Sequence, residues 1–265
     1  MDRRGLHLIE VKSLSYIYNR GGPYQTLALD DLSFSIKQGE IIGVIGPSGS
    51  GKSCLLRCLA GILTPLSGTV LFDGQESYLP KIGLIIQEPE VQFFNETVYQ
   101  EIAFALENQG LTRVEIDETV RLALKKTGYK GKTSQSPFCL SGGEQRRIAI
   151  ACILALDPQI LLLDEPTVGL DFDGLEMLSQ IIKGFRSENK TMLIVSHDLD
   201  FLYNQVDRYL VLDKGRLVID FTKKEFETKI EFLTKMGLAI PEILELKRRG
   251  IPEDLSNLEQ IGMTV

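Results

Sequence analysis

Hydrophobic and polar residues alternate in some stretches of the chain and cluster in others, and the two patterns predict different elements. Alternation over residues 8–12 and 32–36 has the period of half-buried strands. Short, mainly apolar runs at 41–45, 160–163 and 192–196 are typical of buried strands. Strands are therefore expected in the first 45 residues and again between about 160 and 196.

Helical patterns lie between these strands. Capping boxes, in which Ser or Thr is followed three residues later by Glu, open predicted helices over about 112–127 and 141–156. Further helices are expected over 53–63 and 174–187, and residues 210–219 have the pattern of an antiparallel hairpin. The alternation of strand, helix and strand predicts an α/β fold with a parallel sheet.

The C-terminal segment has a pattern of its own. Phe226, Ile230 and Leu233 fall on one helix face. Pro241 and Pro252 each stand where a short helix can begin. We therefore expect a small helical unit that is separate from the preceding domain.

Length and charge exclude several classes of protein. The chain has 265 residues, which fits one large domain with a small appendage. Its net charge of −7 gives no general attraction to nucleic acid or anionic lipid. No apolar run approaches the roughly 20 residues that span a bilayer, and the N-terminus lacks the apolar stretch of a signal peptide. A cytoplasmic chain that reaches a membrane only through a protein partner is expected.

The cysteines show no metal-binding spacing. No Cys-x-x-Cys pair occurs and no histidine lies near them. Reduced, packed thiols are expected at Cys54, Cys58, Cys139 and Cys152.

The strongest chemical signal is a P-loop, Gly46-x-x-x-x-Gly51-Lys52-Ser53, between a predicted strand and a predicted helix. Its glycines allow backbone N–H groups to converge on phosphate oxygens, and the helix N-terminus adds positive potential. Lys52 supplies a charge for the β- and γ-phosphates, and the Ser53 hydroxyl can ligate Mg²⁺. The alternative is a glycine-rich turn with a solvated lysine.

Two further motifs gain meaning beside the P-loop. Asp164 and Glu165 follow the apolar run 160–163 directly. Because burial of unpaired charge is unfavourable, two carboxylates at the end of a buried strand indicate a partner such as a metal ion or a catalytic role. Asp164 fits an aspartate that holds Mg²⁺ through the ion's own ligands, and Glu165 fits a carboxylate that polarises an attacking water. Residues 140–145, Leu-Ser-Gly-Gly-Glu-Gln, form an anion site at a helix start, although alone they would indicate only a capped helix.

Together with Gln87, the run 169–171 (Gly-Leu-Asp) and the run 196–198 (Ser-His-Asp), these motifs resemble the ordered set of ABC-transporter ATPases. The resemblance covers about residues 6–220. It implies a P-loop NTPase core with a parallel sheet, an N-terminal antiparallel β-subdomain and an inserted helical subdomain at about 88–156. The resulting domains are an ABC ATPase cassette at 1–220 and a small, C-terminal helical dimerisation domain at 221–265.

The resemblance also implies the ligands ATP and Mg²⁺ and a role for each matching residue. Glu165, His197 and Gln87 are the expected catalytic residues, and Ser53, Gln87 and Asp164 are the expected metal-binding residues. Tyr18 matches the aromatic residue that stacks on adenine, with Tyr16 as second candidate and a core-facing strand residue as alternative. The phosphate cradle is expected to comprise Gly46, Pro47, Ser48, Gly49, Ser50, Gly51, Lys52, Ser53 and Cys54.

In this family two cassettes enclose two ATP molecules head to tail. Ser141, Gly142 and Gly143 would therefore serve the ATP of the partner, and Asp171 would organise the interface. Glu144 stands where many members have glutamine. A carboxylate near phosphate is unfavourable, so we predict that Glu144 points back to the start of its own helix.

One subgroup is indicated by residues 82–104, by the run Glu144–Arg147 and by the C-terminal tail. These are similar to ATPases of energy-coupling factor importers, which take up vitamins or transition-metal ions. The resemblance implies a position at the cytoplasmic face of the membrane, a second ABC ATPase subunit, a transmembrane coupling subunit and, indirectly, a substrate-binding membrane subunit. It implies no nucleic-acid partner.

In this reading, Gln92, Phe93 and Phe94 line a groove for a helix of the membrane partner, and Glu88 or Glu90 pairs with an arginine there. Three alternatives stay open at this point. They are an ABC importer of another type, an exporter, and a soluble ABC ATPase that acts on nucleic acid.

Overall fold

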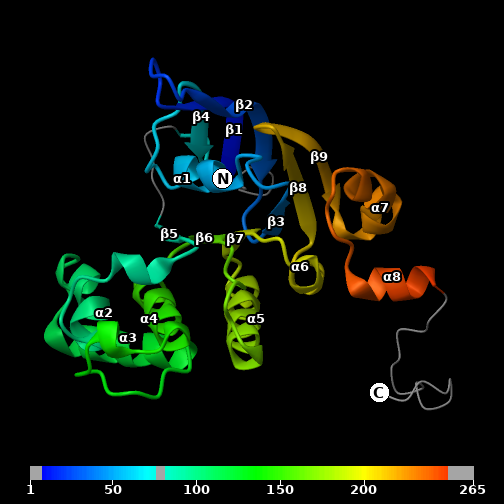
Figure 1. Ribbon diagram of the computed structural model, residues 1–265. Helices are drawn as coiled ribbons and strands as arrows, with labels where there is room; N and C mark the ends of the chain where they lie inside the picture. Colours follow the sequence, from blue (N-terminus) through cyan, green and yellow to red (C-terminus); the bar gives the residue numbers. More distant parts are fainter. Residues whose placement is uncertain (1–7, 76–80, 250–265) are drawn as a thin grey trace, which may run out of the picture.

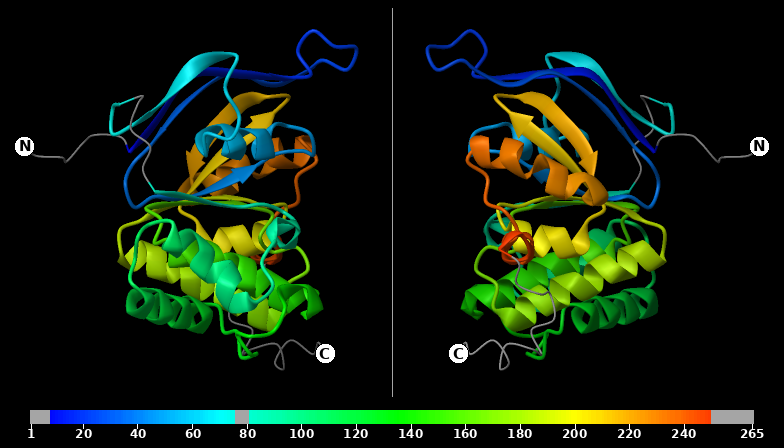
Figure 2. Two further views of the ribbon diagram at one scale, coloured as in Figure 1. Left: turned by 90° about the vertical axis from the view of Figure 1, so that its left-hand side faces the viewer. Right: turned by 90° about the vertical axis from the view of Figure 1, so that its right-hand side faces the viewer.

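The computed structural model describes residues 8–75 and 81–249, apart from the side chains of Pro89 and Glu90. It contains two sheets, a helical layer and a C-terminal pair of helices (Figure 1). Side views show the central sheet edge-on, with helices below it and with α1 (Lys52–Leu59) and the second sheet above it (Figure 2). The predicted α/β fold is confirmed.

The central sheet has the strand order β5-β6-β7-β3-β8-β9. All neighbouring pairs are parallel except β8 and β9, which form the predicted antiparallel hairpin. Every residue of β3, β6 and β7 is buried, which explains why these strands have no alternating pattern. The strands are β3 (Ile41–Ile45), β5 (Ile82–Ile85), β6 (Ile160–Asp164), β7 (Thr191–Val195), β8 (Arg208–Asp213) and β9 (Arg216–Thr222).

The second sheet is antiparallel, in the order β2-β1-β4, as the resemblance implied. Its strands are β1 (Ile9–Tyr18), β2 (Thr26–Ile36) and β4 (Ser67–Phe72). The first two are longer than alternation predicts, because irregularities in the pairing of β1 with β2 interrupt the period. One of them lies at Ser13, which has a positive φ of 48°. The apolar face of this sheet packs with α1 in a common core.

The helical layer comprises α2 (Val98–Glu107), α3 (Arg113–Lys126) and α4 (Gly142–Ala155), preceded by the short 3₁₀ turns η1 (Pro89–Gln92) and η2 (Pro137–Cys139). It has its own hydrophobic core, which includes Ile102 and Ile148. The capping boxes predicted at the starts of α3 and α4 are both present. This layer occupies the region expected for the inserted helical subdomain.

Two predicted helices differ from the structure at their ends, and a third helix was not predicted. The first helix ends at Leu59 rather than near 63, because Gly61 has a φ of 71° and leaves the helical region. Helix α5 (Phe172–Ser187) covers the lower face of the central sheet close to its predicted bounds. Helix α6 (Leu199–Gln205) was not predicted, since its seven residues are too few for a clear period.

The segment after β9 packs on the cassette rather than standing apart from it. It consists of the turn η3 (Lys223–Glu225), α7 (Phe226–Lys235) and α8 (Glu242–Arg248). The predicted face of α7 is buried and joins the core of the central sheet, with the ring of Phe226 5.0 Å from that of Tyr209. Helix α8 begins directly after Pro241, as predicted, whereas Pro252 lies outside the described residues.

Candidate functional site

The sequence motifs come together at one edge of the central sheet. The strands β5, β6, β7 and β3 are neighbours, and each is followed by one motif at its carboxyl end. In open parallel sheets this edge is where ligands bind. A pocket of about 640 Å³ lies there, a size suited to a nucleotide. It is lined by Tyr18, Thr26, Leu27, Ala28, Ser48, Gly49, Ser50, Gly51, Lys52, Ser53, Cys54, Gln87, Glu165, Val168 and His197.

Close backbone approach explains two glycines of the P-loop. A Cβ on Gly46 would lie 2.1 Å from the carbonyl oxygen of Leu212, and a Cβ on Gly51 would lie 2.4 Å from that of Ala28. Both residues also have positive φ angles, 151° and 102°. These positions accept only glycine, so the path of the loop depends on them.

Lys52 lies inside the loop and is held by its backbone. Its ammonium donates hydrogen bonds to the carbonyl oxygens of Gly46 at 2.7 Å and Pro47 at 3.0 Å. Burial lowers the pKa of Lys52, and the carboxylates of Glu165 and Asp164 partly offset this. The charge is thus confined to the floor of the pocket.

Two hydroxyl groups in the loop are available to a ligand. The Ser53 hydroxyl donates to Oδ1 of Asp164 at 3.0 Å, which joins the P-loop to the end of β6. The Ser50 hydroxyl is buried and has no hydrogen-bond partner among the described residues. A buried polar atom without a partner is unfavourable, which makes the Ser50 hydroxyl a candidate contact for a polar ligand.

Glu165 and His197 face each other across the ends of β6 and β7. One carboxylate oxygen of Glu165 accepts the backbone N–H of His197 at 3.1 Å, and the other lies 3.3 Å from Nε2 of the imidazole. Glu165 has a φ of 50°, in the left-handed region that non-glycine residues seldom adopt. Strain of this kind is typical of functional sites whose surroundings fix the backbone.

Tyr18 closes the pocket on the side of the antiparallel sheet. Its ring packs edge-on against Tyr16 at 4.9 Å. Burial, followed by a hydrogen bond with the Cys54 thiol, raises the pKa of Tyr18 to about 12. A hydrogen bond with Cys58 lowers the pKa of Cys54. Tyr18 is partly buried: it packs against the core beside the antiparallel sheet and also lines the pocket.

The remaining predicted residues lie outside this pocket. Ser141, Gly142 and Gly143 form the exposed start of α4, and a Cβ on either glycine would meet nothing within 4 Å. Asp171 is exposed and caps α5 through a 2.8 Å hydrogen bond from the N–H of Gly174. The chain thus has a second glycine-containing helix start, which lies on the surface and outside the pocket.

Glu144 points to its own helix, as predicted. Its carboxylate accepts the N–H of Ser141 at 3.0 Å and the hydroxyl of Ser141 at 2.8 Å. These two hydrogen bonds lower the pKa of Glu144. The carboxylate is therefore kept in its ionised form, and its oxygen is directed at the start of its own helix.

Replacing Glu144 with glutamine is expected to change kcat and KM for ATP by less than about threefold, because glutamine also completes a capping box. Steady-state ATPase assays measure this. Glu144→Ala is the matched comparison, and thermal denaturation should show that it destabilises the chain more than Glu144→Gln. A tenfold rise in ATP affinity for Glu144→Gln would mean that the carboxylate faces phosphate after all.

The sequence did not indicate three contributors to the site. Val168 lines the pocket, and residues 26–28 of β2 form its outer wall. Arg146, in α4, is buried and donates hydrogen bonds to backbone atoms beside the pocket. Its helical spacing to the buried residues Ala149 and Ile150 is the signal that would have placed it on the inner face of α4.

The expected groove for a membrane partner is only partly as predicted. Phe94 is 61% exposed and packs edge-on against Phe104, itself exposed, with ring centres 4.7 Å apart. Phe93, in contrast, is 9% exposed and belongs to the core of the helical layer, so it supports this surface from beneath. The side chain of Glu90 lies outside the described residues.

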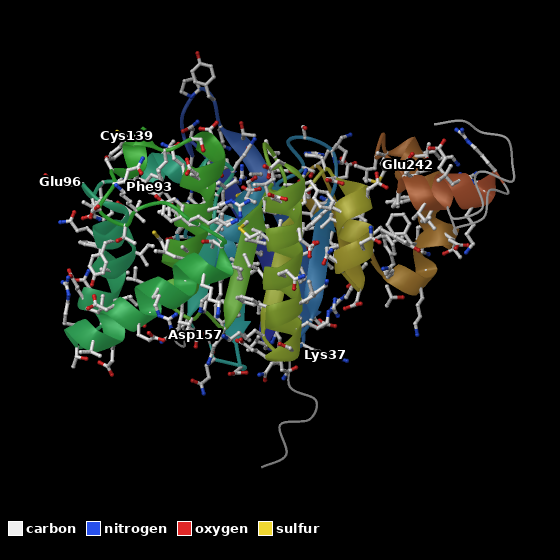
Figure 3. All side chains as sticks on the ribbon, turned by 90° about the horizontal axis from the view of Figure 1, so that it is seen from below. Lys37, Phe93, Glu96, Cys139, Asp157 and Glu242 are labelled. Atoms are coloured by element: carbon white, nitrogen blue, oxygen red, sulfur yellow. The ribbon has the colours of Figure 1, made fainter. Side chains whose placement is uncertain are left out.

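A buried carboxylate shapes the loop that carries Phe94. Glu101, in α2, accepts the backbone N–H groups of Phe94 at 3.1 Å and Asn95 at 2.8 Å. Viewed from below the sheet, Phe93 and Glu96 lie at the same corner of the molecule as Cys139, opposite the edge with Asp157 and Lys37 (Figure 3). The exposed aromatic rings are thus held at one corner of the helical layer.

No described helix has the length and apolar character that a membrane span requires. Within residues 8–75 and 81–249, no group of three His, Cys, Asp or Glu side chains is arranged to hold a metal ion.

Comparison with known proteins agrees with this geometry. A family model described as ABC transporter matches residues 29–168. The energy-coupling factor transporter ATP-binding protein EcfA2 of Caldanaerobacter subterraneus is 40% identical over 95% of this chain and 94% of that protein. The EcfA2 protein of Thermotoga maritima is 42% identical over 86% of this chain and 89% of that protein.

Solved structures give the same result. The structure of cbiO1 from Clostridium perfringens, part of the ABC transporter complex cbiONQ, is 34% identical and has a TM-score of 0.72 over 92% of this chain and 99% of that one. The cassette MJ0796, in a dimeric post-hydrolysis state bound to ADP and Pi, is 27% identical and has a TM-score of 0.74 over 81% of this chain and 98% of that one. With these relatives and this arrangement of motifs around one pocket, the chain belongs to the ABC transporter family of ATP-binding proteins.

Proposed function

We propose that the chain is the ATP-hydrolysing motor subunit of an energy-coupling factor importer. The observation that carries the proposal is the convergence of the P-loop, Gln87, Glu165 and His197 at the ends of four adjacent strands, around one nucleotide-sized pocket. The relatives with 35–42% identity that carry the EcfA2 name support the energy-coupling factor class. The transported substrate would be a vitamin or a transition-metal ion, recognised by membrane subunits.

The residues present fit ATP and Mg²⁺. Lys52 is held where it can meet the β- and γ-phosphates, and the partnerless Ser50 hydroxyl accounts for one further polar contact. Ser53 and Asp164 are already hydrogen-bonded to each other and would hold Mg²⁺, together with Gln87. The ion would supply charge compensation at the phosphates. Tyr18 would stack on adenine.

Hydrolysis then requires a positioned water. Glu165 would accept a proton from that water, and Gln87, which lines the same pocket, would orient it. His197 would contact the γ-phosphate, since its imidazole already borders the Glu165 carboxylate. The chemistry consists mainly of positioning and charge compensation.

A complete site would need a second cassette. The N-terminus of α4 at Ser141, Gly142 and Gly143 is open, and it carries the N–H groups and helix dipole that favour phosphate. These residues would complete the ATP site of the partner ATPase, and Asp171 would lie at the interface. The segment 221–265 would contribute a further dimer contact.

The exposed aromatic surface would bind the transmembrane coupling subunit and hold the chain at the cytoplasmic face of the membrane. Phe94 and Phe104 are large, exposed and rigidly presented, the properties of interface anchors. The surface is close in sequence to Gln87, so movement of the membrane partner would reach the ATP site over a short segment. Exposed Glu88 would offer a charge to an arginine of that partner.

Replacing Phe94 with aspartate is expected to reduce recovery of the membrane subunits at least about tenfold, because an interface anchor that is lost costs about 2 kcal/mol or more. The measurement is co-purification from membranes of cells that express the tagged chain with its transporter subunits. ATP hydrolysis by the isolated variant should stay within about twofold of wild type, since only an exposed side chain changes.

Val218→Asp is the matched control, because Val218 is a similarly exposed apolar residue on β9, remote from the helical layer. The control should recover the membrane subunits fully. Equal recovery with Phe94→Asp and Val218→Asp would contradict the proposed docking surface. Recovery of nucleic acid or ribosomes instead of membrane subunits would contradict the proposed function.

A further inference from the structure

Arg146 connects the helical layer to the nucleotide site through backbone atoms. Arg146 is buried, with 8% of its surface exposed. Its guanidinium donates hydrogen bonds to the carbonyl oxygen of Val168 at 2.5 Å and to that of Glu165 at 2.9 Å. A third hydrogen bond, of 3.3 Å, runs to the carbonyl oxygen of Gln87. All three acceptors belong to residues that line the pocket.

Two of these acceptors are the ends of a single turn. The N–H of Val168 points to the carbonyl oxygen of Glu165 at 3.4 Å, so residues 165–168 close a four-residue turn directly after β6. The Nη1 atom of Arg146 binds one end of this turn and its Nη2 atom binds the other. The Thr167 hydroxyl, in the middle, lies 3.2 Å from that of Ser196 at the end of β7.

This arrangement explains how the positive φ of Glu165 is maintained. A left-handed conformation persists only where neighbouring groups fix the backbone. The N–H of Glu165 is held by Val195 of β7 at 2.9 Å, and its carbonyl is held by Arg146. The direction of the Glu165 side chain therefore depends on a residue of α4.

The guanidinium is suited to this task in a way that lysine is not. Its nitrogen atoms form a planar fork that can reach two carbonyl groups together, whereas an ammonium is a single point of charge. A buried charge without hydrogen bonds would be costly, so its place beside the pocket needs these acceptors. Burial and geometry both indicate a specific structural link.

The same helix begins at the surface proposed to meet the ATP of the partner. Arg146 follows Ser141 by five residues, which places it about 7.5 Å further along the helix axis. Both positions belong to one helix of 14 residues, whose backbone hydrogen bonds connect them. A displacement of the start of α4 is thereby transmitted to the turn that carries Glu165.

We propose that Arg146 is a positioning residue that makes the geometry of Glu165 depend on the position of α4. The proposal rests on the proposed function, in which the start of α4 meets the ATP of the partner. Docking of that ATP at Ser141 would then align Glu165 for hydrolysis at the chain's own ATP. The two ATP sites of a dimer would be linked by this one side chain.

Arg147 provides a matched control. It is the next residue of α4, and its guanidinium donates to the carbonyl oxygen of Thr127 at 2.8 Å, inside the helical layer. Arg147→Gln therefore removes a guanidinium from the same helix together with its hydrogen bond to Thr127. It leaves the hydrogen bonds between Arg146 and the turn at residues 165–168 unchanged. Arg146→Lys keeps the charge and loses the two-ended contact.

The experiment compares wild type, Arg146→Gln, Arg146→Lys and Arg147→Gln in the purified complex with the second ATPase and the membrane subunits. For Arg146→Gln we expect kcat for ATP hydrolysis to fall about 10- to 100-fold, the loss that follows from misplaced catalytic groups. The KM and the affinity for a non-hydrolysable ATP analogue should stay within about threefold, because the P-loop is untouched. Arg146→Lys should lie between Arg146→Gln and wild type, and Arg147→Gln within about threefold of wild type.

Several results would overturn the proposal. One is equal kcat for Arg146→Gln and Arg147→Gln. Another is a loss of analogue affinity in Arg146→Gln as large as its loss of kcat, which would indicate a collapsed pocket. A wild-type kcat in Arg146→Lys would show that the simultaneous contact of the guanidinium with Val168 and Glu165 does not matter for hydrolysis. If Arg146→Gln does not fold, the kcat of Arg146→Lys alone tests the proposal. A different result would contradict the proposed function itself: the tagged wild-type chain co-purifies with no membrane subunit, or it hydrolyses no ATP.

Discussion

Replacing Glu165 with glutamine is expected to lower the rate of ATP hydrolysis by about 100-fold to 10,000-fold, the contribution of a positioned general base. The amide has the shape of the carboxylate but cannot accept a proton from water. Its oxygen can still accept the N–H of His197, the hydrogen bond that is 3.1 Å long in the present structure. The local structure should therefore be retained.

ATP binding should survive this substitution. The groups expected to hold phosphate belong to the P-loop, and Lys52 donates its hydrogen bonds to the carbonyl oxygens of Gly46 and Pro47 rather than to Glu165. Loss of a nearby negative charge should, if anything, strengthen binding of the phosphates. We expect the variant to bind ATP at least as tightly as wild type and to accumulate as an ATP-bound dimer.

Size-exclusion chromatography with and without ATP, beside a single-turnover hydrolysis assay, measures both effects. Glu118→Gln is the matched control, because Glu118 is exposed and its carboxylate pairs within α3, with Arg121. The control should hydrolyse ATP at the wild-type rate. More than about a tenth of wild-type activity in Glu165→Gln would exclude Glu165 as the general base.

The parts of the site that sequence predicts are those in which the chemistry is local. The P-loop can be predicted from the sequence because its glycines, Lys52 and Ser53 act within one continuous segment, and the strand before it is an apolar run. Asp164 and Glu165 can be predicted as functional because burial of two carboxylates at the end of such a strand is unfavourable without a partner. The order of the strands in the sheet was not read from the sequence but is what brings these segments together.

Arg146 shows why other parts were missed. In sequence it is the first of two adjacent arginines, and nothing in the residue types separates it from Arg147. Only the packing of α4 against the end of the sheet decides that one guanidinium reaches Glu165 and the other reaches Thr127. Contacts of this kind link residues that are far apart along the chain, so local patterns carry little information about them.

Element boundaries failed for a different reason. Strand β1 was predicted too short because alternation stops at a bulge near Ser13, although pairing with β2 continues to Tyr18. Phe93 was expected on an open surface, yet it packs into the core of the helical layer while Phe94 faces outward. Two adjacent phenylalanines in a turn give no period from which the buried one can be chosen.

Replacing Lys52 with methionine is expected to weaken ATP binding about 100-fold. Methionine has similar length and fills the same buried space, but it carries no charge and donates no hydrogen bond. A hydrogen bond between charged groups contributes about 1.5–3 kcal/mol, and the lost attraction to the phosphates adds to this. Equilibrium titration with a fluorescent ATP analogue measures the change, with the exposed Lys37, beyond the opposite end of β3, replaced by methionine as the control.

The pH dependence of ATP binding is a second, independent test of the contact between Lys52 and the phosphates. Burial lowers the pKa of Lys52 in the free chain, and the negative phosphates of ATP favour its protonated form. Affinity should therefore be full below the free-state pKa of Lys52 and should fall as the pH rises through it. In Lys52→Met this alkaline loss should be absent, whereas Lys37→Met should retain it. If Lys52→Met kept both wild-type affinity and the alkaline loss, the phosphates would be bound elsewhere, and the pocket at the end of β3 would not be the ATP site.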